Sequence, residues 1–101
     1  PHDAYANDED LAKGIFNFEE VVNYSVKRIT SSWAGLRTFA PDRTLVIGFD
    51  SVVPSFFWLA GQGGYGFQTS AAASKMASEI ILGEKSSFGQ LQKKVSPNRF
   101  K

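Results

Sequence analysis

One stretch of the sequence combines glycines, aromatic residues and a helix-forming segment in an order that suits ligand binding. The apolar run at 56–60 leads into GQGGYG at 61–66 and then into an alanine-rich segment. This order predicts a strand, a glycine loop and a helix. Glycines leave backbone N–H groups uncovered, and a helix N-terminus adds unpaired donors and the positive end of its dipole. The loop is therefore suited to an anionic or electron-rich group.

The loop also matches the pattern G-x-G-x-x-G through Gly61, Gly63 and Gly66. A dinucleotide fingerprint needs, in addition, a second parallel strand after the helix that ends in an acid about twenty residues on. Glu84 is near that distance, but no apolar strand precedes or follows it. A phosphate-binding loop would need a Lys-Ser/Thr pair after the glycines, which is missing. Two interpretations remain: a strand-to-helix connection without a ligand, or a backbone wall for part of a larger cofactor.

Arg37 is the candidate for recognition of an anionic group. Alternation over a predicted strand at 29–39 puts it on one face with Trp33 and Phe39. A guanidinium in an aromatic pocket suits bidentate capture of a carboxylate. The alternative is a structural arginine whose stem packs on the aromatic rings and whose head reaches solvent or pairs with Asp42. Tyr65 has two interpretations as well, a hydroxyl at the site or an aromatic lid on the loop.

These candidates need a scaffold of helices and strands. Apolar residues at helical spacing predict a helix at 8–23, and the strand at 29–39 should form a hairpin with a strand at 44–49. The segment 56–60 is apolar at every position, as in a central strand covered on both faces.

The elements after the glycine loop complete the predicted scaffold. Thr69 or Ser70 is a suitable cap for a helix that stops at Gly83. The polar tail at 92–101 should lie on the surface, and the lysine pair within it is most simply a solvated surface feature.

Composition narrows the class of protein. The chain has 101 residues, which suits one domain, and its net charge of +1 with no basic stripe argues against nucleic-acid binding. It has no cysteine, which excludes disulfides, thiolate metal sites and cysteine nucleophiles, and we expect a cytoplasmic location. We also expect no membrane span, because no apolar run is long enough. His2, the single histidine, should be inert on a loose arm. The start at Pro1, without Met, suggests a piece of a longer protein.

Three blocks of sequence carry a family resemblance. They read SWAGLRTFAPD at 32–42, VIGFD at 46–50 and FFWLAGQGGYGFQT at 56–69. Together they resemble the C-terminal portion of the FAD-dependent D-amino-acid oxidase superfamily, and within it they are most similar to glycine oxidase and D-arginine dehydrogenase-like enzymes. The similarity extends from about Asp8 to Gly83, and SPNR at 96–99 is similar to the end of some members.

The resemblance implies specific roles. Arg37 matches the arginine that grips the substrate carboxylate, and Gly35 and Gly64 match backbone positions near the substrate. The family oxidises an amino acid by hydride transfer to FAD, which yields an imine that hydrolyses to a keto acid and ammonia. The resemblance implies no catalytic side chain and no metal ligand in this chain. The residues it places beside the flavin are Gly61, Gln62, Gly63, Gly64, Tyr65, Gly66, Phe67, Gln68 and Thr69.

The expected architecture is an α+β fragment with an N-terminal helix, an antiparallel hairpin, a central buried strand and a C-terminal helix. In the parent enzyme, residues 1–28 would end the substrate domain, 29–84 would complete the FAD-binding α/β domain, and 85–101 would form a polar tail. Alone, the chain should neither hold FAD tightly nor turn over an amino acid. Uncovered apolar faces should pair with the rest of the parent or with a second copy. The alternative function is a non-catalytic interaction module that reuses this half of the fold.

Overall fold

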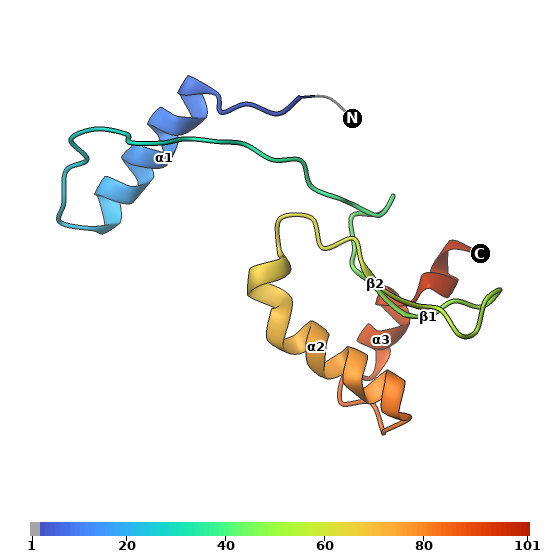
Figure 1. Cartoon of the computed structure of the whole chain (residues 1–101). Helices are drawn as coiled ribbons and strands as arrows, with labels where there is room; N and C mark the ends of the chain where they lie inside the picture. The colour runs from blue at the N-terminus through green and yellow to red at the C-terminus, as the bar shows by residue number, and fades with distance from the viewer. Residues whose placement is uncertain (1–2) are drawn as a thin grey trace. The chain divides into compact units, whose positions relative to one another are not determined.

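The structure is a computed structural model that describes residues 3–101, so His2 lies outside the described residues. The chain divides into two compact units, one ending at Leu36 and the other running from Arg37 to Lys101. Figure 1 shows the elements of each unit. Among residues 3–101, no helix combines the length and the apolar character that a membrane crossing requires.

The first unit contains one helix, α1 (Asp8–Val21), which confirms the helix predicted at 8–23. The side chain of Asn7 caps it by accepting the Glu9 N–H at 2.8 Å. Three acidic residues in the first turn stabilise the positive end of the helix dipole. No residue of α1 is buried, although Leu11 and Ile15 are half-buried.

The predicted strand at 29–39 is wrong. From Tyr24 to Thr38 the described backbone has neither helix nor strand, and only Phe39 pairs, in an isolated antiparallel bridge with Gln62. Alternating apolar residues produce a strand only where a neighbouring backbone accepts and donates the ladder hydrogen bonds. In the part of the chain that the structure describes, Phe39 bridges Gln62 and the Thr38 carbonyl accepts the Gly63 N–H, but the backbone at 29–37 has no such partner.

The strands predicted at 44–49 and 56–60 are both present, but the antiparallel hairpin pairs them with each other, whereas we predicted that 44–49 would pair with 29–39. The hairpin joins β1 (Val46–Phe49) to β2 (Phe57–Ala60), with Ile47 opposite Leu59. Asp50 holds the connecting loop, since its Oδ1 accepts the N–H groups of Val52 and Val53, each at 2.8 Å. The indole N–H of Trp58 donates to Asp50 Oδ2 at 3.0 Å. These bonds, led by that from Trp58, lower the pKa of the Asp50 carboxyl.

The α+β class is confirmed, but the buried strand is β1 rather than β2. The helices α2 (Gly66–Leu82) and α3 (Gln90–Val95) both pack against β1 (Figure 1). We predicted cover on both faces of 56–60, whereas Trp58 and Leu59 are 38% and 47% exposed. The reason is that the helices cover the neighbouring strand. The core consists of Ile47, Ala73, Met76, Ala77 and Val95.

The helix α2 starts earlier than predicted and ends as predicted. Its N-cap is Tyr65 rather than Thr69 or Ser70, and the Thr69 hydroxyl donates to the Tyr65 carbonyl at 2.8 Å from within the first turn. Gly83 ends the helix in the left-handed conformation with φ 66°.

A buried carboxylate of α2 binds the loop that follows the helix. Glu79 accepts both the backbone N–H and the hydroxyl of Ser87. These bonds lower the pKa of the Glu79 carboxyl.

The C-terminal segment is not the polar surface tail that we predicted. The helix α3 buries Val95 in the core, and a 3-10 helix, η1 (Pro97–Phe100), follows it and also packs on β1. A Cβ at Gly48 would lie 3.0 Å from Pro97 Cδ, so η1 and the strand are in close contact. The apolar residues of this segment that pack on the core are few and are separated by polar residues, so its local composition wrongly predicts a surface tail.

Candidate functional site

The glycine loop joins β2 to α2 by a tight turn. Gly61 and Gly63 have φ of 69° and 53°, a region that residues with a Cβ rarely adopt. The Tyr65 N–H donates to the Gln62 carbonyl at 3.0 Å and closes the turn. The loop conformation therefore requires glycine at 61 and 63, and the predicted strand, loop and helix occur in that order.

One side of the loop is held by the segment that contains Thr38 and Phe39. The Gly63 N–H donates to the Thr38 carbonyl at 2.9 Å, and Phe39 forms its bridge with Gln62 one position along. A Cβ at Gly63 would overlap one edge of the Phe39 ring. The absence of a side chain at 63 therefore permits the close approach of the two backbones.

The other side of the loop is open. A Cβ at Gly64 would meet no heavy atom within 4 Å, and Phe67 is 96% exposed. No side chain caps α2, and Thr69 is the first residue whose N–H bonds within the helix, to the Tyr65 carbonyl at 3.0 Å. Helix geometry thus leaves the N–H groups of Gly66, Phe67 and Gln68 directed out of the helix end.

Arg37 directly precedes Thr38, the residue whose carbonyl binds Gly63, and its side chain is exposed. The exposed side chain agrees with the solvated head of the structural alternative, whereas two of the partners named in that alternative, Asp42 and the Phe39 ring, belong to other arginines. Asp42 pairs with Arg99 at 2.7 Å, and the guanidinium over the Phe39 ring is that of Arg43, 4.9 Å from the ring centroid.

The other residues predicted near the substrate are two glycines. Gly35 belongs to the first unit, is exposed, and has no heavy atom within 4 Å of an added Cβ. Gly64 is on the open side of the loop in the second unit.

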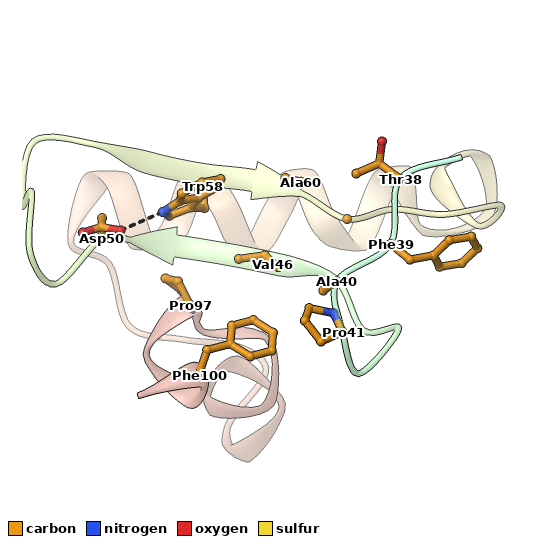
Figure 2. A pocket seen from close by; sticks show the side chains of 11 residues that line it. Thr38, Phe39, Ala40, Pro41, Val46, Asp50, Trp58, Ala60, Pro97 and Phe100 are labelled. Carbon is orange, nitrogen blue, oxygen red and sulfur yellow. Dashed lines mark hydrogen bonds between the residues drawn. The ribbon is translucent and has the colours of Figure 1, made fainter. Parts of the chain in front are cut away.

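A cavity of about 320 Å³ lies on the face of the hairpin that carries Val46 and Trp58 (Figure 2). Of the predicted site residues, Gly61 alone lines it, beside Pro97 and Phe100 of η1. This cavity could not be predicted from the sequence, because its walls come from four separated segments. Its lining is largely apolar and its carboxylate, Asp50, is already hydrogen-bonded, so we treat it as part of the scaffold.

A family model described as FAD dependent oxidoreductase matches residues 2–80. The chain belongs to the FAD-dependent oxidoreductase family. The match spans most of the sequence and includes Arg37, the whole glycine loop and nearly all of α2. It confirms, at the level of the family, the resemblance carried by the blocks at 32–42, 46–50 and 56–69.

The residues of this FAD-dependent oxidoreductase fit one part of the cofactor. The open amide groups at the start of α2 and the uncovered Gly64 suit the electron-rich pyrimidine edge of a flavin ring. The described residues form one two-stranded antiparallel sheet, and α2 leads to α3 rather than to a parallel strand. The loop therefore lacks the context of a dinucleotide fingerprint. No group of His, Cys, Asp or Glu among residues 3–101 is arranged to hold a metal ion.

Proposed function

We propose that this chain is the C-terminal segment of a flavoenzyme that oxidatively deaminates a D-amino acid or a glycine-like amine, related to glycine oxidase and D-arginine dehydrogenase-like enzymes. The observation that supports the proposal most is the pairing of the segment after Arg37 with the glycine loop. Family membership supplies the chemistry, and this pairing links the predicted carboxylate anchor to the predicted flavin wall.

The register of this backbone pairing indicates which loop residue lies opposite Arg37. Phe39 bridges Gln62, and Thr38 binds Gly63. If the antiparallel register continues by one more pair, Arg37 lies opposite Gly64. Gly64 is on the open side of the loop, so a small substrate there would have a guanidinium within reach and no side chain in its way.

In this proposal the residues of the chain bind and orient. Arg37 holds the substrate carboxylate by two parallel hydrogen bonds, which directs the Cα–H bond of the substrate. The amide groups at the start of α2 stabilise negative charge at the pyrimidine edge of the ring. FAD, when bound, supplies the acceptor for the hydride. The imine product is then hydrolysed to a keto acid and ammonia.

Anaerobic mixing tests the proposed reaction in the FAD-loaded enzyme that contains this chain. Glycine or a D-amino acid is expected to bleach the flavin absorption band, because the hydride moves to the ring in the absence of oxygen. For each D-amino acid the L-enantiomer is the matched control, since it offers its hydrogen from the wrong side of Cα. If no member of a panel of glycine and D-amino acids bleaches the band, the proposal is wrong.

The isolated chain of 101 residues is expected to bind FAD more weakly than micromolar. In our proposal the glycine loop contacts one edge of the flavin ring, and the adenosine and diphosphate contacts belong to the rest of the parent. Titration of FAD followed by flavin fluorescence measures this, with the FAD-loaded enzyme as the positive control. A dissociation constant below a micromolar would show that the chain holds the cofactor without the parent.

A further inference from the structure

We propose that Phe39 is the positioning residue of the glycine loop: its ring, held in place by Arg43, sets the conformation of Gly63. The consequence for the flavin rests on the proposed function, whereas the positioning itself does not. No sequence pattern singles out Phe39 for this role.

Among the glycines of the loop, Gly63 is the one at which an added Cβ would lie nearest to another residue, the Phe39 ring. The ring atoms Cδ1, Cε1 and Cζ all lie where a side chain at 63 would stand. In Figure 2 the ring points away from Phe100, on the side of the segment that leads from Ala60 to α2. Gly63 is therefore confined on two sides, by this ring edge and by its hydrogen bond to the Thr38 carbonyl.

The ring of Phe39 is itself restrained. The Arg43 guanidinium lies over its face, 4.9 Å from the centroid. Arg43 is in the left-handed conformation with φ 60°, and its N–H donates to the Ala40 carbonyl at 2.9 Å. The turn after Phe39 thus brings the cation back over the ring, while the ring edge faces Gly63.

A glycine loop needs such a restraint because glycine has more backbone freedom than any other residue. Gly63 has no side chain of its own to pack, so an outside group must limit its φ and ψ. Phe39 is the large side chain in contact with it. Removing the ring should release Gly63 while leaving the packing of Ile47 against α2 intact, because Phe39 is not part of that core.

Hydrogen–deuterium exchange of the full chain tests this role. In Phe39→Ala the Gly63 amide is expected to exchange on the order of tenfold faster than in the wild type, because its bond to the Thr38 carbonyl opens more often. The matched control is Phe100→Ala. Phe39 and Phe100 both line the cavity shown in Figure 2, and their exposed fractions are similar, 41% for Phe39 and 46% for Phe100. Phe100 also has an arginine over its ring, since the Arg99 guanidinium lies 4.2 Å from the ring centroid.

The exchange rate of the Gly63 amide in these variants shows whether Phe39 positions the loop. An unchanged Gly63 rate in Phe39→Ala, or the same acceleration in Phe100→Ala, would overturn the role of Phe39. Phe39→Leu keeps an apolar side chain at the contact and should recover most of the protection. Should Phe39→Ala fail to fold, Phe39→Leu against Phe100→Leu gives the same comparison, with a smaller acceleration expected at Gly63.

A second measurement separates this inference from the proposed function. In the FAD-loaded enzyme, Phe39→Ala is expected to shift the flavin absorption maxima and the midpoint potential, whereas Phe100→Ala leaves both unchanged. If Gly63 exchanges faster but neither flavin property moves, Phe39 still positions the loop, and the placement of the loop beside the flavin is wrong.

Discussion

Arg37→Ala in the FAD-loaded enzyme is expected to lower kcat/KM for the amino-acid substrate by roughly 100-fold or more. If Arg37 is the carboxylate anchor, as we propose, the substitution removes both charged hydrogen bonds and leaves the substrate carboxylate without its partner. Steady-state kinetics with the best substrate from the anaerobic panel measures the effect.

Two variants control this experiment. Arg37→Lys keeps the positive charge but loses the planar pair of donors, so its kcat/KM should fall between those of the wild type and Arg37→Ala. Arg28→Ala removes an exposed arginine from the irregular segment of the first unit and should leave kcat/KM unchanged. A wild-type kcat/KM in Arg37→Ala would remove Arg37 from the substrate site.

Arg99→Ala is expected to lower the free energy of unfolding of the second unit by about 2 kcal/mol. The Arg99 side chain, 14% exposed, donates to both carboxylate oxygens of Asp42 and to the carbonyls of Thr44, Val95 and Ser96. Its loss releases the C-terminal segment from the turn before β1. Thermal unfolding followed by circular dichroism should show a fall in Tm of about 10 °C.

The pH dependence of stability gives this ion pair a second readout. Hydrogen bonding from Arg99, the main cause, lowers the pKa of Asp42 from 3.8 to about 2. The folded state thus holds the proton less tightly than the unfolded state, so the contribution of the pair is complete above about pH 4 and is lost as the pH falls toward 2.

The pKa values of Asp50 and Glu79 are also lowered in the folded state, so their protonation at low pH also reduces the free energy of unfolding. Arg99→Ala should therefore reduce, without abolishing, the loss of Tm between pH 4 and pH 2. Lys94→Ala is the control, because it removes an exposed charge of α3 that contributes to none of these pKa shifts, and it should retain the full pH dependence. An equal pH dependence in Arg99→Ala and the wild type would contradict the assignment to the Asp42 pair.

Some parts of the fold could be predicted because local chemistry is sufficient for them. The helical spacing of apolar residues identifies α1, and Gly83 identifies the end of α2. Each depends on residues within one turn of one another, so neighbours in sequence are also the partners in space.

Other parts could not be predicted because their partners are distant in the sequence. The segment 29–37 has the alternation of a strand, but its backbone has no hydrogen-bonded neighbouring strand among the described residues. Arg99 is 57 residues from Asp42, and nothing in the polar composition after position 90 indicates that Val95 belongs to the core. Pairing over such separations depends on the whole chain, not on a local window.

The sequence by itself determined the family motif, the glycine loop, and the order of strand, loop and helix, since these follow from residue types and local spacing. The tertiary structure alone decided that β1 rather than β2 is the buried strand and that Arg99 forms the ion pair with Asp42. It also brought Phe39 against Gly63. The physical reason is that a glycine can be recognised by its own conformation, whereas the side chain that confines it can come from any segment that reaches it.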